Sequence, residues 1–183
     1  MRRFVSRGWS LVELMVAIAI VALLVTLTFP AYSFIKAKMQ FAGCVANLKS
    51  LHAGLSTYTQ DHAMVWPQYP DDIREVGDEE GEDKLSVWWF ETLKPYGVTR
   101  ATWLCPADRD GHEHDNENTE HLMVSYGVTL FDEMPNSAYR WLQPWVVESG
   151  QNHGKSQGPN VIMPDGQVRQ GVGIEMVAPV QQE

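Results

Sequence analysis

The chain begins with a long apolar stretch that carries one isolated charge. From Leu11 to Phe29 nearly every residue is apolar, and Glu13 lies close to the start. A helix of about 20 residues, rising about 1.5 Å per residue, crosses a bilayer, so the stretch is long enough to predict a membrane-spanning helix. Arg2, Arg3 and Arg7 precede it, and the positive-inside bias then places the N-terminus in the cytoplasm.

Beyond the apolar stretch the pattern becomes amphipathic. Two series with a spacing of seven residues form one apolar stripe: Phe34, Phe41, Leu48 and Leu55, with Ala37, Cys44, Leu51 and Tyr58. The stripe predicts a helix that continues over residues 31–62 and packs on the chain's own C-terminal domain, with a coiled coil as the alternative. Pro30 predicts a kink or a short melted stretch near residues 26–30. Pro67 and Pro70 predict that the helix ends around residues 61–66.

The rest of the chain contains short elements separated by turns. Residues 71–84 indicate an acidic exposed loop with up to one helical turn, and residues 85–94 indicate a short helix. Residues 122–129 predict a strand, and Asp165-Gly166 predicts a turn between strands at 160–163 and 167–169. A long helix beside about three short antiparallel strands predicts an α+β fold.

Composition and charge narrow the class of protein. The 183 residues have room for one domain besides the helix, and seven Trp and six Tyr argue against disorder. The formal charge is −9, and removal of the three N-terminal arginines would take it to −12. A nucleic-acid partner is not expected, because that function needs a basic face.

Glu13 requires an explanation, because a carboxylate in hydrocarbon costs about 2.5–3.5 kcal/mol even on an insertion scale. No small-residue cleavage site follows Phe29, so the processing point predicted by the pattern lies before the apolar stretch, at Gly8. A cut there would leave the amine of Trp9 about one helical turn from Glu13. That amine, from the same chain or from a neighbouring subunit, would supply a counter-charge. The alternative is a plain signal anchor in which Glu13 has no role.

The residues from Arg7 to Leu24, RGWSLVELMVAIAIVALL, resemble the class III signal of type IV pilins and type II secretion pseudopilins. The resemblance implies that a prepilin peptidase cuts after Gly8 and N-methylates Trp9. It also implies that Glu13 pairs with the N-terminal amine of an adjacent subunit during filament assembly. Pro30 matches a proline common in the family helix, whereas Trp9 replaces the usual Phe.

The same resemblance implies a pilin-like organisation and a structural role without enzymatic activity. The expected parts are a leader at 1–8, a transmembrane and assembly helix at 9–30, its amphipathic continuation at 31–62, and a globular α+β domain at 63–183. The expected partners are other pseudopilin subunits, alike or different, the prepilin peptidase and an inner-membrane assembly platform. The protein would cross the inner membrane once, with its C-terminal domain in the periplasm, and would join a periplasmic or surface filament.

A second resemblance covers the globular part. It is to large pseudopilin-like families of planctomycete and verrucomicrobial bacteria, and it rests on Cys44…Asn47-Leu48-Lys49, Tyr58…Asp61, Trp66-Pro67, Leu104-Cys105-Pro106-Ala107-Asp108, Ser125-Tyr126-Gly127 and Asp165-Gly166. Those proteins often have a His nine residues before the Asp-Gly turn. Here eleven residues separate His153 from Asp165, so the spacing between the His and the Asp-Gly turn is wider than in those families. Asp108 is expected to brace the turn after Pro106.

Cys44 and Cys105 are candidates for a disulfide in an extracytoplasmic compartment, with two buried free thiols as the alternative. Closing a loop of about 60 residues stabilises a fold by roughly 4 kcal/mol in the chain-entropy model. Two cysteines alone are too few for the usual zinc site.

Residues 108–121 combine Asp, Asn, Glu and His, a composition that suits calcium, with Asp108, Asp110 and Asp115 as the candidate ligands. Their spacing does not match an EF-hand, and a solvated acidic loop is the alternative. No other cofactor is expected. A metal-dependent enzyme that uses the histidines of this loop is a weaker hypothesis, because the sequence has no hydrolase motif.

A rival function makes the protein an anchored module that binds a glycan or a peptide. It would use the aromatic side chains of the globular part: Trp88, Trp89, Trp103, Trp141 and Trp145. The competing interpretation is that most of these side chains form the core.

Overall fold

The computed structural model describes residues 10–74, 79–108, 122–140, 143–150, 152–153 and 159–170, except for the helical side chains at 27–31, 72, 74 and 79–83. The chain divides into two compact units, with the boundary between Met39 and Gln40. The first unit contains the N-terminal part of one long helix. The second contains the rest of that helix, the shorter helices and a sheet.

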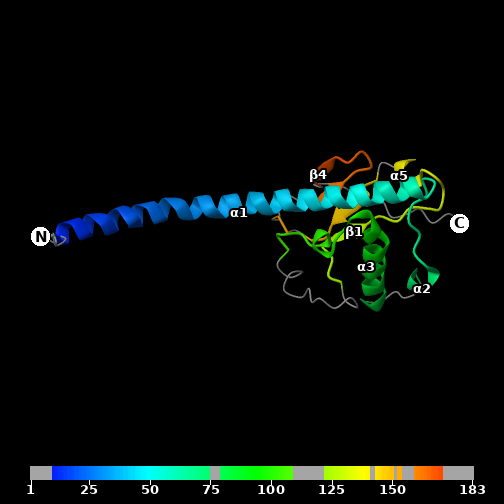
Figure 1. Ribbon diagram of the computed structural model, residues 1–183, viewed down its shortest axis with the longest axis horizontal. Helices are drawn as coiled ribbons and strands as arrows, with labels where there is room; N and C mark the ends of the chain where they lie inside the picture. The colour runs from blue at the N-terminus through cyan, green and yellow to red at the C-terminus, as the bar shows by residue number, and fades with distance from the viewer. Residues whose placement is uncertain are drawn as a thin grey trace, which may run out of the picture. The chain divides into compact units, whose positions relative to one another are not determined.

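Helix α1 (Leu11–Asp61) is continuous for 51 residues (Figure 1). It therefore passes through Pro30 as helix, and the melted stretch expected near residues 26–30 is not formed. The predicted end is correct: α1 stops at Asp61, and Ala63 and Met64 then take positive φ values of 53° and 64°. The Met64 N–H donates to the Thr59 carbonyl at 2.7 Å, which satisfies a carbonyl of the last turn.

Short helices follow α1. They are α2 (Asp71–Arg74), α3 (Glu79–Leu93), the 3₁₀ helices η1 (Lys94–Tyr96) and η2 (Arg100–Trp103), and later α5 (Ser137–Arg140). The predicted helix at 85–94 is the C-terminal part of α3, which begins earlier, within the stretch expected to be an acidic loop. Pro95 and Gly97 end it as predicted, with Gly97 in the left-handed region at φ 84°.

A four-stranded antiparallel sheet completes the second unit. Its strands are β1 (Tyr126–Val128), β2 (Val146–Glu148), β3 (Asn160–Ile162) and β4 (Val168–Gln170), and they are hydrogen-bonded in chain order. The hairpin turn at 164–166 is confirmed. The strand expected over 122–129 shortens to three residues, and β2 was not predicted. The long helix with a small antiparallel sheet is an α+β, pilin-like arrangement.

The core of the second unit lies between α1 and the sheet. Cys44, Leu48, Leu51 and Leu55 are fully buried and belong to one cluster with sheet and loop residues such as Trp145 and Ile162. The predicted stripe therefore packs on the chain's own domain, as expected, but only from about residue 41. Phe34, its first member, is 62% exposed.

Most of the described tryptophans are core residues. Trp66, Trp89, Trp103 and Trp145 are each at most 3% exposed. The Trp66 indole N–H donates to the Thr129 carbonyl and that of Trp145 to the Ala138 carbonyl, so both rings are fixed by polar contacts as well as packing. Trp88 is partly buried against the same cluster, and Trp141 lies outside the described residues. The aromatic set that motivated a binding module is thus mainly structural.

Candidate functional site

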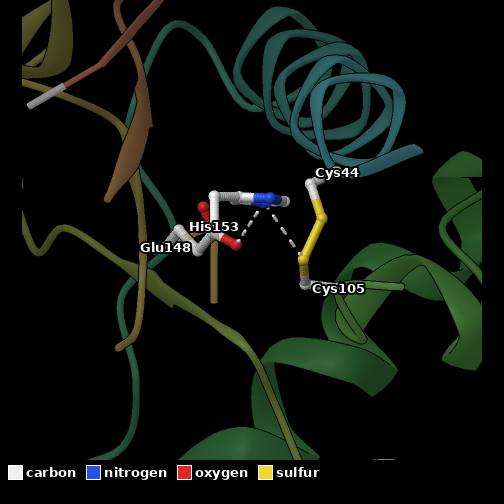
Figure 2. A group of neighbouring side chains, drawn as sticks. All are labelled: Cys44, Cys105, Glu148 and His153. Carbon is white, nitrogen blue, oxygen red and sulfur yellow. Dashed lines mark hydrogen bonds and ion pairs between the residues drawn. A yellow bond between two sulfur atoms is a disulfide. The ribbon is translucent and has the colours of Figure 1, made fainter. Parts of the chain in front are cut away.

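The first candidate site surrounds a disulfide between Cys44 of α1 and Cys105, which follows η2 (Figure 2). The Cα atoms are 5.0 Å apart, and both residues are fully buried. The sequence left pairing and free thiols open as alternatives, and this structure has the pair bonded. The bond attaches the segment after η2 to the helix.

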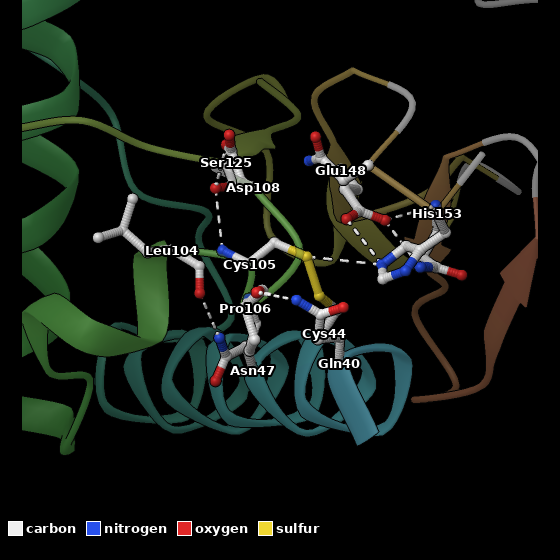
Figure 3. The surroundings of a disulfide bond; sticks show 12 residues. Gln40, Cys44, Asn47, Leu104, Cys105, Pro106, Asp108, Ser125, Glu148 and His153 are labelled. Carbon is white, nitrogen blue, oxygen red and sulfur yellow. Dashed lines mark hydrogen bonds and ion pairs between the residues drawn. A yellow bond between two sulfur atoms is a disulfide. The ribbon is translucent and has the colours of Figure 1, made fainter. Parts of the chain in front are cut away.

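Side-chain amides of α1 hold the same segment from either side of the bond (Figure 3). The Gln40 amide donates to the Pro106 carbonyl at 2.9 Å, and the Asn47 amide donates to the Leu104 carbonyl at 2.8 Å. Gly43 permits this close approach, because a Cβ there would lie 2.8 Å from Cγ of Pro106. The helix therefore binds two backbone carbonyls around Cys105, those of Leu104 and Pro106, in addition to the disulfide.

Ser125 links Cys105 to Asp108. The Cys105 N–H donates to Ser125 Oγ at 2.9 Å, and that hydroxyl donates to Asp108 Oδ2 at 2.7 Å (Figure 3). The Asp108 N–H in turn donates to the Cys105 carbonyl at 2.9 Å. Asp108 thus braces the turn after Pro106, the structural role expected from the sequence. Of the other calcium candidates, Asp110 and Asp115 lie outside the described residues.

A buried carboxylate and an imidazole lie beside the disulfide. Because strand side chains alternate between faces, Glu148 shares the core face of β2 with Val146. Its Oε1 lies 3.1 Å from His153 Nε2, and the same nitrogen lies 3.5 Å from Cys105 Sγ (Figure 2). The Phe41 ring contacts the imidazole edge to face, with centroids 5.4 Å apart.

The sheet presents a polar row toward this cluster. Tyr126 lies opposite Glu148 in the β1–β2 register, and Asn160 donates to Glu148 from β3 through its backbone N–H and its amide. Burial raises the pKa of the Tyr126 hydroxyl, and the nearby carboxylates of Glu148 and Asp108 also raise it. Sequence reasoning did not select Glu148 or Asn160. The sequence feature that could have identified Glu148 is its position directly after the apolar residues 145–147.

The second candidate site lies at the start of α1. The Ser10 N–H donates to Glu13 Oε2 at 2.8 Å, and the Val12 N–H donates to Ser10 Oγ at 3.4 Å. This reciprocal arrangement resembles a capping box, which satisfies donors that a helix N-terminus leaves unpaired. Glu13 is exposed, and Gly8 and Trp9 lie outside the described residues.

The first unit exposes its apolar side chains. Each of the following is more than half exposed: Leu11, Val12, Leu14, Met15, Val16, Ile18, Ile20, Val21, Leu23, Leu24, Val25, Tyr32, Phe34, Ile35 and Met39. Within the described part of the chain, no helix combines the length and the apolar character needed to cross a membrane. The transmembrane helix expected over residues 9–30 stays a prediction. Residue 9 and the side chains at 27–31 are not among those that the structure describes.

Comparison with known families identifies the N-terminal segment. Residues 3–29 match the family described as "Prokaryotic N-terminal methylation motif". The chain carries a prepilin-type methylation signal. No curated protein and no solved structure matches the chain.

The prepilin-type signal includes the residues expected to act in processing and assembly. Gly8, Trp9 and Glu13 lie within the matched range, and Pro30 lies one residue beyond it. The signal supports processing as a type IV pilin-like precursor. The match does not extend to the disulfide, His153 or the sheet, so the roles of those residues rest on geometry.

Proposed function

We propose that this protein is a structural, non-enzymatic subunit of a type II secretion pseudopilus or a type IV pilus-like filament. The observation that carries the proposal is the methylation signal with a carboxylate, Glu13, in the first turn of an apolar helix. A prepilin peptidase would cut after Gly8 and methylate the new amine of Trp9. The precursor would be anchored in the inner membrane, with its second unit in the periplasm.

Glu13 would guide assembly through charge. Its carboxylate lies among exposed apolar side chains, so burial of that surface between helices would leave the charge in a low-dielectric environment. A buried charge without a partner is costly, whereas the amine of a neighbour's Trp9 would neutralise it. Only one axial register between neighbouring helices would bring the two groups together. The partners are therefore other subunits of the same or a related kind, together with the inner-membrane assembly platform.

The geometry at Ser10 adds a detail to this role. Glu13 Oε2 already accepts the Ser10 N–H, which holds the carboxylate at the helix start, close in sequence to Trp9. The contact restricts the side chain before assembly, so less rotamer entropy is lost when a neighbour's amine approaches.

The test begins with the N-terminus of the protein purified from membranes of its own host. Intact mass and N-terminal sequencing should give Trp9 as the first residue with one added methyl group. Replacement of Gly8 by Ala or a larger residue should leave the precursor uncut. A mature chain that starts at Met1, or one cut beyond Phe29, would remove the basis of the proposal.

Glu13→Gln separates processing from assembly. The variant should be cut normally but should yield less filament in sheared fractions, because the amide keeps the shape and removes the charge. Glu91→Gln is the matched control: Glu91 is exposed on α3 and pairs with Lys94 at 3.1 Å, so its loss should not change filament yield. Normal assembly of Glu13→Gln subunits would exclude the pairing with the amine.

A further inference from the structure

Four side chains that can ligate a metal converge beside the disulfide. One ligand atom from each of Cys44, Cys105, Glu148 and His153 lies within 4.8 Å of the other three (Figure 2). They come from four separate places in the second unit: helix α1, the turn after η2, strand β2 and the turn at 152–153. Folding, rather than a local sequence motif, brings them together.

The group is closed to solvent. Both cysteines are fully buried, and the side chains of His153 and Glu148 are 5% and 0% exposed. Among the described residues, Glu148 Oε1 has no hydrogen-bond partner, although it lies within ion-pair distance of the imidazole. A fully buried carboxylate oxygen without a donor is costly, and it points at the sulfur and nitrogen atoms of the group.

The other carboxylate oxygen of Glu148, Oε2, is held by two hydrogen bonds on the side away from the disulfide. Oε2 accepts the Asn160 N–H at 3.1 Å and the Asn160 amide at 2.7 Å. Metal-binding carboxylates are commonly oriented by such outer contacts, which leave one oxygen aimed at the ion. Here the two donors turn Oε1 toward His153 and the disulfide.

Two of the distances already suit a tetrahedral zinc ion. With ordinary Zn–S, Zn–N and Zn–O bonds, neighbouring ligands are about 3.6 Å apart for S and N and about 3.3 Å apart for N and O. Cys105 Sγ and His153 Nε2 are 3.5 Å apart, and Nε2 and Glu148 Oε1 are 3.1 Å apart. The two sulfurs must also separate to about 3.8 Å, which requires cleavage of their bond.

We propose that the reduced form of this chain binds one zinc ion through Cys44, Cys105, His153 and Glu148. The same two sulfur atoms would bond either to each other or to the metal. This site is independent of the proposed filament role and would exist in the second unit before assembly. Zinc is the metal of choice because a set of two thiolates, one imidazole and one carboxylate matches its preferred ligands and coordination number.

Conversion of the disulfide form into the zinc-bound form is a thiol–disulfide exchange followed by metal binding. A dithiol reductant supplies two electrons and two protons: its two sulfurs form a disulfide, and the bond between Cys44 and Cys105 becomes two thiols. Zinc then replaces the two thiol protons, which are released to solvent. Before oxidation in the periplasm, a newly made chain already has both thiols and needs no reductant.

The competing explanation is that His153 and Glu148 form a purely structural ion pair next to a permanent disulfide. That explanation predicts no zinc binding by the oxidised chain and, in the reduced chain, no zinc binding that depends on His153 and Glu148. Zinc affinity that depends on reduction and on both side chains separates the two explanations.

The experiment uses the full chain in detergent, either oxidised or reduced with a phosphine under anaerobic conditions. After addition of zinc chloride and removal of unbound metal, the reduced chain should retain one zinc per molecule and the oxidised chain none. Cobalt(II) in place of zinc should give thiolate charge-transfer bands and the intense visible bands of a tetrahedral site. Circular dichroism of each sample reports whether the chain is folded.

Ligand variants test the assignment. His153→Gln and Glu148→Gln keep both cysteines and should each weaken zinc binding of the reduced chain by at least about 10-fold, the lower end of the effect known for outer-shell changes. His52→Gln is the matched control. His52 is a partly buried histidine of the same unit that stacks on Trp145, at a centroid distance of 4.6 Å, and it is not among the four ligands.

Any one of four results would overturn the proposal. One is a folded, reduced chain that retains no zinc. Another is zinc that survives both ligand variants unchanged, which would indicate adventitious binding to thiols alone. The third is a loss of zinc on His52→Gln equal to that on His153→Gln. If reduction unfolds the chain, zinc added during refolding should restore the circular dichroism signal of wild type but not of Cys44→Ala/Cys105→Ala, and failure to do so would also exclude the site.

Discussion

Asn160 holds one oxygen of Glu148 with two donors, its backbone N–H at 3.1 Å and its amide at 2.7 Å. Both residues are almost fully buried, in neighbouring strands of the sheet. The pair explains how strand β2 tolerates a carboxylate on its core face. It also determines which oxygen of Glu148 points toward His153 and the disulfide.

Removal of the amide donor should destabilise the second unit. Asn160→Ala should lower the free energy of unfolding by about 1–3 kcal/mol, because a buried carboxylate then loses one of its two hydrogen bonds. The measurement is the urea midpoint at an unchanged slope. Asn152→Ala is the control, since the Asn152 amide donates to the Ser149 carbonyl at an exposed position and its loss should cost less. Equal effects of the two variants would show that the contact with Glu148 is energetically unimportant.

The disulfide should contribute much of the stability of the second unit. It closes a sequence separation of 61 residues, for which the chain-entropy model gives about 4 kcal/mol. In the presence of a chelator, reduction should therefore lower the thermal midpoint of wild type. The variant Cys44→Ala/Cys105→Ala should unfold at a lower temperature with or without reductant. A midpoint of wild type that reductant leaves unchanged, with reduction verified by thiol titration, would contradict this prediction.

Gly54 allows α1 to approach the segment after η1. A Cβ at this position would lie 2.7 Å from Val98 Cγ2, and Val98 is a stiff, β-branched side chain that is 2% exposed. Overpacking costs about 1–3 kcal/mol, more than the roughly 1 kcal/mol that Ala gains over Gly in a helix. Gly54→Ala should therefore destabilise the protein.

The effect of Gly54→Ala on stability should change sign once the clash is removed. In a Val98→Ala background, Gly54→Ala should stabilise by up to about 1 kcal/mol, because only the helix propensity remains. Denaturant unfolding of the four proteins gives the coupling energy. Additive effects of the two substitutions would mean that the contact with Val98 does not limit residue 54.

Tyr126 should make stability fall at high pH. Its pKa in the folded state is raised above the ordinary value of 10.0, chiefly by burial. The folded chain therefore retains a proton that the unfolded chain releases above pH 10.0. The contribution to stability is complete below that pH and is lost as the pH rises further.

Alkaline titration can isolate this residue among the six tyrosines. In wild type, tyrosinate absorbance should show a last step that coincides with the loss of far-ultraviolet circular dichroism. Tyr126→Phe should remove that part of the absorbance change and shift unfolding to higher pH. Ionisation of Tyr126 before unfolding begins would contradict the effect of burial.

The sequence by itself determined the elements that depend on local pattern. The methylation signal, the long helix and its end near Asp61 follow from contiguous residues whose spacing or type is decisive. The α+β class and the hairpin at Asp165-Gly166 follow for the same reason. The stripe from Phe41 onward was visible as a repeat of seven residues, because helical periodicity places those side chains on one face.

Only the tertiary structure decided what surrounds Cys105. Strand β2 has three residues, too few for a clear alternation, and its partners β1 and β3 are separated from it by long connections. The direction in which Glu148 points depends on that pairing, and the position of His153 depends on the turn that follows β2. Side chains from α1, the turn after η2 and two strands meet there because the core buries them together. Contacts between residues so far apart in the chain leave no periodic trace in the sequence.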